Sequence, residues 1–128
     1  MEKKTYILYG LVVIIVVALG FAIRRANQQP GDYDGFAQCL AESGAKMYSA
    51  WWCGHCQEQK RWFGKSFEVF DESGGHVECS PGGIKTFSDF CKKVDGFSGT
   101  PYWIMGDGEQ LRGKQPLEIL AQKSGCEL

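Results

Sequence analysis

The first pattern in the chain is an uncharged apolar run over residues 6–23. Two lysines precede this run and two arginines follow it directly. At ~1.5 Å of rise per residue, a helix of this length spans ~27 Å, which is close to the thickness of a bilayer core. The pattern predicts a transmembrane signal-anchor helix over 6–23, after a cytoplasmic terminus at 1–5 and before a linker at 24–34.

A cleaved signal peptide is the alternative for this run. Small residues two apart, at 18–20 and 20–22, resemble cleavage sites. However, the run is longer than the apolar part of a typical signal peptide, and the arginines follow it without a break. Both features favour an uncleaved anchor.

Beyond residue 34, short apolar segments alternate between helical spacing and strand-like composition. Asp34 is expected to cap the first helix. In the second helix, Phe63, Phe67 and Phe70 share a face with Cys56. The expected elements begin with helix 35–43, strand 46–51, helix 57–70 and strand 76–79. A helix capped by Thr86 follows, and its buried face is formed by Phe87, Phe90, Cys91 and Val94. Strands 101–105 and 109–112 then form a hairpin, and the last helix runs from Pro116 to Gly125. This order predicts one α/β domain over 35–128.

Charge and cysteine content narrow the class of protein. Residues 30–128 contain 10 Lys and Arg against 14 Asp and Glu, without a basic cluster, so nucleic acid is not an expected partner. Flanking charge does not decide the orientation of the apolar run. Six cysteines in a small domain suit an oxidising compartment. We therefore expect the domain to face the periplasm or the cell exterior.

The candidate chemistry lies in the pentapeptide at 52–56, Trp-Cys-Gly-His-Cys. A thiolate at Cys53 would be stabilised at the first turn of a helix and would be the nucleophile in thiol–disulfide exchange. His55 can carry positive charge beside it, and Cys56 is placed to resolve the mixed disulfide. The motif predicts an enzyme whose redox group is the Cys53–Cys56 disulfide itself, with no other cofactor.

A zinc site is the alternative reading of this motif. Structural zinc sites usually show a second ligand pair of similar spacing. The remaining candidates, His76, Cys79 and Cys91, do not form one. Because a CxxC between a strand and a helix is typical of redox proteins, no metal is expected.

The ordered set of segments resembles the thioredoxin superfamily, and more narrowly the thioredoxin-like domain associated with bacterial and plant homologues of vitamin K epoxide reductase. The segments that carry the resemblance are Gly44–Tyr48, Trp52–Lys60, Val77–Cys79, Gly96–Trp103 and Leu117–Gly125. The resemblance implies a three-layer α/β/α fold with a mixed four-stranded sheet.

The resemblance also implies roles for individual residues. Cys53 would attack and Cys56 would resolve, and Pro101 would be a cis-proline lying against them. Substrate contacts are implied at Thr100, through its backbone, and at Trp52 and Gly54 within the pentapeptide. The chain departs from the superfamily where relatives carry a buried acid six residues before the first cysteine, because Met47 stands there; Lys46 and Glu58 are weak substitutes.

Four further cysteines remain. The resemblance implies a Cys79–Cys91 disulfide, which would contribute about 2–3 kcal/mol in the chain-entropy model; two buried free thiols are the alternative. Cys39 and Cys126 stay open, because sequence does not determine connectivity. Helices in their positions tend to lie on opposite faces of a thioredoxin sheet, which argues against their pairing.

The residues between the two cysteines bear on the direction of electron flow. Gly-His is the pair found in protein disulfide isomerase, whose potential is ~−180 mV against ~−270 mV for thioredoxin. The leading hypothesis is a thiol oxidase for exported proteins, reoxidised by a vitamin K epoxide reductase-like or similar membrane quinone reductase. The alternatives are a reductase or isomerase, including one acting on apocytochrome thiols, and a tethered metal-binding or structural module.

Overall fold

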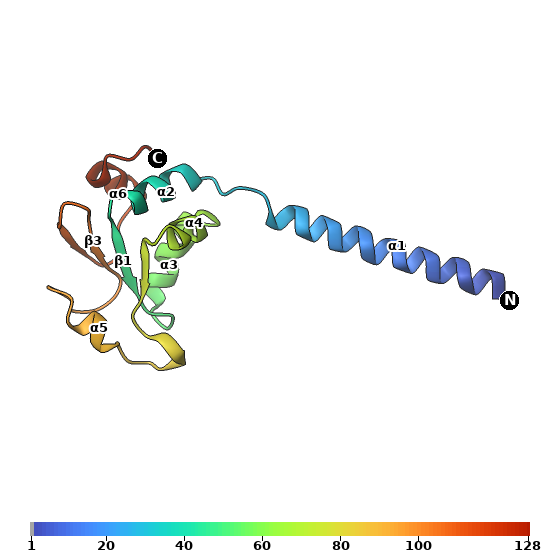
Figure 1. The fold of residues 1–128 in the computed structure, drawn as a ribbon, viewed down its shortest axis with the longest axis horizontal. Coiled ribbons are helices and arrows are strands. Elements are labelled where there is room, and N and C mark those ends of the chain that lie inside the picture. The colour runs from blue at the N-terminus through green and yellow to red at the C-terminus, as the bar shows by residue number, and fades with distance from the viewer. Residues whose placement is uncertain (1) are drawn as a thin grey trace. The chain divides into compact units, whose positions relative to one another are not determined.

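The computed structural model describes residues 2–128, and the chain divides into two compact units, one ending at Pro30 and one spanning Gly31–Leu128 (Figure 1). The first unit is the helix α1, Glu2–Asn27. Its most apolar 18-residue window has a mean hydropathy of 2.7, and the helix is long and apolar enough to cross a membrane. The expected N-terminal apolar helix is therefore confirmed, and it extends beyond the apolar run at both ends.

The second unit is built on a mixed four-stranded sheet. Its strands are β1 (Lys46–Ser49), β2 (His76–Glu78), β3 (Tyr102–Ile104) and β4 (Gln110–Arg112), in the order β2-β1-β3-β4. β1 pairs in parallel with β2, and the other pairs are antiparallel. The helices are α2 (Asp34–Glu42), α3 (Gly54–Phe63), α4 (Ser66–Glu72), α5 (Asp89–Lys92) and α6 (Leu117–Ser124), with a 3₁₀ turn at Pro81–Gly83. The predicted α/β class with a mixed four-stranded sheet is confirmed.

Alternation along the strands gives the sheet two apolar faces. Met47 and Trp103 face one cluster, to which α2, α3, α4 and α6 all contribute buried side chains. Tyr48 and Tyr102 face the other cluster, which contains Cys79 and Cys91. The sheet is thus covered by four helices on one side and by α5 with its flanking segments on the other.

The helix expected over 57–70 is two helices. Gly64 adopts a φ of +58°, a conformation that favours glycine, and it ends α3 before α4 starts at Ser66. Apolar spacing continues across the break, because Phe63 and Phe70 are both buried with ring centroids 5.7 Å apart. The periodicity therefore identified the buried positions and missed the break.

Three local predictions were wrong. Asp34 is the first residue of α2 and not its cap, and its carboxylate accepts a hydrogen bond from Gly31 N at 3.0 Å. Ser88 caps α5 in place of Thr86, since its Oγ accepts from Cys91 N at 3.3 Å. α5 is only one turn long, so Phe90, adjacent to the buried Cys91, turns away from the core and is 65% exposed.

Candidate redox site

The two motif cysteines lie where β1 leads into α3. Cys53 is the N-cap residue of α3, and the two residues are joined as a disulfide. The Cys56 backbone N–H points at Cys53 Sγ, 3.2 Å away. Cys53 is 8% exposed and Cys56 is fully buried. Cys53 is therefore the sulfur that a partner thiol can reach, and the helix N-terminus favours its thiolate after reduction.

Backbone from a distant loop lies against the outer sulfur. The Thr100–Pro101 peptide bond is cis, and the Thr100 carbonyl oxygen is 3.5 Å from Cys53 Sγ. In the reduced protein, a Cys53 thiol could donate to this carbonyl. The geometry brings Thr100 and Pro101 to the dithiol from 47 residues away in sequence.

The remaining motif residues are on the surface. Trp52, Gly54 and His55 are exposed. Trp52 is held by its indole, which donates to Ser80 Oγ at 3.0 Å. His55 lies in the first turn of α3, and its charge is one of several that act on Glu58.

Met47, at the position where the resemblance implies an acid, is fully buried. Glu58 has a pKa below its usual value, chiefly because Lys114 donates a 2.6 Å hydrogen bond to its carboxylate, and it is held in that ion pair. Lys46 donates to the Gly74 carbonyl. Neither residue that the sequence offered as a substitute is engaged with the dithiol.

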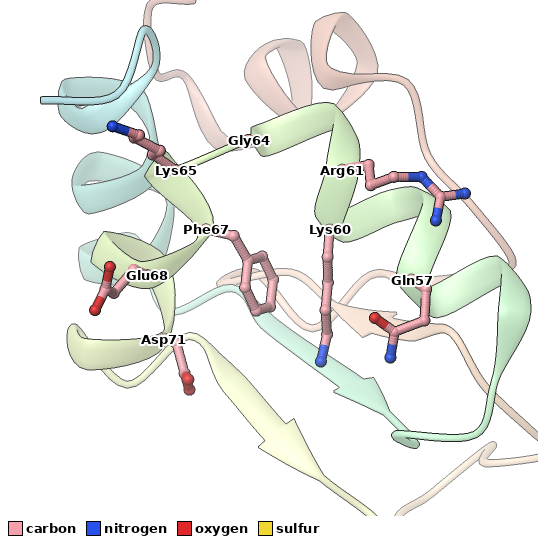
Figure 2. A pocket seen from close by; sticks show the side chains of 8 residues that line it. All are labelled: Gln57, Lys60, Arg61, Gly64, Lys65, Phe67, Glu68 and Asp71. Atoms are coloured by element: carbon pink, nitrogen blue, oxygen red, sulfur yellow. The ribbon is translucent and has the colours of Figure 1, made fainter. Parts of the chain in front are cut away.

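A polar cluster that sequence reasoning missed lies under α3 and α4. His76 Nε2 is 2.6 Å from the buried Ser49 Oγ, and His76 Nδ1 is 3.0 Å from Asp71 Oδ1. A cavity of about 550 Å³ opens beside it, and Figure 2 shows Lys60, Phe67 and Asp71 among the side chains that line this cavity. The ammonium of Lys60 lies 5.1 Å from the Phe67 ring centroid. Alternation along β2 did not signal that His76 faces inward, because His76 and Glu78 are the polar residues on either side of Val77.

Burial lowers the pKa of His76, the nearby charge of Lys60 lowers it further, and Asp71 partly offsets both. Burial likewise lowers the pKa of Lys60, against the opposing effects of Glu78 and Asp71. The folded protein therefore resists protonation of His76 more than the unfolded chain does. This contribution to stability is fully present above the unfolded pKa of about 6.5 and is lost as the pH falls through the lower folded value.

The first prediction concerns this histidine. Replacing His76 by glutamine should flatten the fall of the unfolding free energy between pH 7.5 and pH 5, because the variant has no imidazole to protonate. Urea denaturation at a series of pH values measures this slope. His55→Gln, which removes the exposed histidine, is the matched control. Equal slopes for the wild type and His76→Gln would contradict the prediction.

The other four cysteines form two disulfides. Cys79 and Cys91 are fully buried and bonded to each other. Cys39 and Cys126 are bonded with a Cα–Cα distance of 5.9 Å. The argument against this second pair was wrong, because α2 and α6 contact each other on the same face of the sheet.

The chain was compared with known proteins. No family model matches it. The thiol-disulfide oxidoreductase LTO1 of Arabidopsis thaliana is 40% identical to it over 97 residues, which cover 72% of this chain and 24% of the relative. The chain thus spans about a quarter of the length of that relative. This chain is therefore similar to a part of a thiol-disulfide oxidoreductase, and it carries a disulfide of its own at the start of α3.

Proposed function

We propose that this protein is a membrane-anchored thiol oxidase that donates the Cys53–Cys56 disulfide to thiols of exported proteins. The observation that carries the proposal is a disulfide at a helix N-terminus, in which Cys53 is 8% exposed and Cys56 is fully buried. Helix α1 would be the anchor, with the second unit facing the periplasm or the cell exterior. The domain would belong to the type associated with vitamin K epoxide reductase homologues.

The exchange runs through Cys53. A substrate thiolate attacks Cys53 Sγ, the Cys53–Cys56 bond breaks, and Cys56 leaves as a thiolate. A second substrate thiolate then attacks the substrate sulfur of the mixed disulfide and releases the Cys53 thiolate. The substrate loses two electrons and two protons to become a disulfide, and the protein becomes a dithiol. A vitamin K epoxide reductase-like or other membrane quinone reductase would reverse this reduction and pass the electron pair to quinone.

The groups that stabilise the dithiol form support the oxidising direction. The N-terminus of α3, including the Cys56 N–H, favours a thiolate at Cys53. A protonated His55 in the same turn would add to this effect. Whatever stabilises the reduced thiolate raises the potential and makes the disulfide a stronger oxidant.

The second prediction is the potential itself. The Cys53–Cys56 couple of the full chain in detergent micelles should equilibrate with glutathione buffers at about −200 mV or higher. His55→Ala should lower the reduction potential. Gln57→Ala, which changes the residue directly after Cys56, should leave the potential unchanged. A value near about −270 mV would contradict the oxidase direction and support the reductase alternative.

A further inference from the structure

Residues 80–90, which we call the cystine loop, are enclosed by the Cys79–Cys91 disulfide. In Figure 1 this segment, yellow to orange, lies at the end of the sheet where β1 leads into α3. It presents Ile84 and Phe90 to solvent with 62% and 65% of their surface exposed, more than any other large apolar side chain of residues 31–128. Isolated exposed apolar residues are common in proteins, so their surroundings decide whether they matter.

The cystine loop packs against the two tryptophans that precede Cys53. The Trp52 ring centroid is 5.3 Å from that of Phe87, and its indole donates to Ser80 Oγ. The ammonium of Lys85 lies 6.0 Å from the Trp51 ring centroid. Trp51 is itself 43% exposed and Trp52 36%. The loop that carries Ile84 and Phe90 therefore borders an aromatic surface next to the dithiol, through its contacts at Phe87 and Lys85.

Hydrogen bonds tie this loop to the redox segment. One carboxylate oxygen of Glu78 accepts from Trp51 N at 3.2 Å and from Ser80 N at 2.8 Å. Within the loop, Ser80 Oγ donates to the Thr86 carbonyl at 2.9 Å. Ser88 N donates to the Cys79 carbonyl at 2.7 Å. The loop is thus an ordered surface that is pinned at both ends, with Ile84 and Phe90 exposed and Phe87 packed against Trp52.

The charge of this segment differs from that of the domain. The loop itself carries Lys85 and Asp89, and Lys92 and Lys93 follow Cys91 directly. Lys92 lies 3.9 Å from Asp89, so the surplus positive charge is that of Lys85 and Lys93. Residues 30–128 as a whole contain more acids than bases, 14 against 10. A partner that covers the loop would therefore meet local positive charge around an apolar centre, which favours an acidic partner.

We propose that the cystine loop is the docking surface for the thiol-bearing polypeptide, and that it selects extended segments with apolar residues near the cysteine and acidic residues beside them. The proposal rests on the proposed function, because the occupant is the substrate of the Cys53–Cys56 couple. With the substrate cysteine at Cys53, the Thr100 backbone lies on one flank and the Trp52–Phe87 contact on another. Ile84 and Phe90 then determine specificity and take no part in the sulfur chemistry.

The third prediction tests this surface with the full chain in detergent micelles. The probes are dithiol peptides with apolar–acidic, apolar–basic or Gly/Ser flanks, and dithiothreitol as a thiol without flanks. Ile84→Ser/Phe90→Ser should lower kcat/KM for the apolar–acidic peptide about tenfold or more, mainly through KM. Its rate with dithiothreitol should be unchanged. Leu128→Ser, which alters another exposed apolar residue, should change neither rate.

A second variant reads out charge. In Lys85→Glu/Lys92→Glu, kcat/KM should fall for the acidic-flanked peptide relative to the basic-flanked peptide. A loss of stability would lower both values together and would not change their ratio. Unchanged peptide kinetics in both variants, or equal losses with dithiothreitol and peptide, would overturn the docking role and leave the oxidase function standing. If a variant turns a dimer of this protein into a monomer and leaves the peptide kinetics unchanged, the loop would be a contact between two copies of the chain. That result would overturn the docking role. A wild-type protein that oxidises none of the dithiol peptides and does not oxidise dithiothreitol would overturn both the docking role and the oxidase function.

Discussion

Replacing Cys53 by serine is expected to reduce thiol oxidation to the background rate, a loss of about a thousandfold or more. Cys53 carries the accessible sulfur of the couple, and Cys56 is fully buried. A serine hydroxyl cannot form a disulfide with the substrate, so the covalent route is removed. The measurement is the oxidation rate of a dithiol peptide, with glutathione disulfide supplied to reoxidise the protein.

The matched control removes a disulfide away from the dithiol. Cys39→Ala/Cys126→Ala should keep the wild-type rate per folded molecule, because this pair joins α2 to the C-terminal segment. A Cys53→Ser protein that retained more than about a tenth of the rate would place the reacting sulfur elsewhere.

The second large effect is on stability. The Cys39–Cys126 disulfide joins residues 87 apart in sequence, and the Cys79–Cys91 disulfide joins residues 12 apart. In the chain-entropy model, removing the first should cost about 4–5 kcal/mol and the second about 3 kcal/mol. Small domains are stable by only about 5–15 kcal/mol, so the first loss takes a large share.

Urea denaturation of the full chain in detergent micelles compares the two double-alanine variants. The ranking is the sharper prediction, because loop length must outweigh burial: Cys39 is exposed, whereas Cys79 and Cys91 are fully buried. A smaller loss for Cys39→Ala/Cys126→Ala than for Cys79→Ala/Cys91→Ala would show that native contacts of α2 and α6, and not closure of the long loop, determine the stability.

Much of the fold followed from local patterns. The strand before the dithiol, the helix after it and the final hairpin are each encoded within a few residues, by aromatic content, apolar spacing and a glycine turn. The break at Gly64 escaped because apolar spacing continues across it. The exposure of Phe90 was not predicted, because on a one-turn helix adjacent residues such as Phe90 and Cys91 point in different directions.

The features that could not be predicted depend on long-range packing. The pairing of Cys39 with Cys126 requires α2 and α6 to lie against the same face of the sheet, which neither segment encodes. The contact between Ser49 and His76 likewise depends on the parallel pairing of β1 with β2, 27 residues apart in sequence. Within the site, the spacing of Cys53 and Cys56 indicated the chemistry. The groups that contact this segment from elsewhere in the chain, such as the Thr100 carbonyl, are brought there by the fold.

The most direct test of the account is to trap the mixed disulfide at Cys53. In a Cys56→Ala protein expressed in cells, the Cys53 thiolate should attack a disulfide of an exported protein and displace one of its sulfurs as a thiolate. Because Cys56 is not there to attack the resulting bond, covalent adducts should accumulate that run as larger species on non-reducing gels. Reductant should release these adducts, and the Cys53→Ser/Cys56→Ala double variant should not form them. Adducts of equal amount in the double variant, or none in either variant, would contradict disulfide exchange through Cys53.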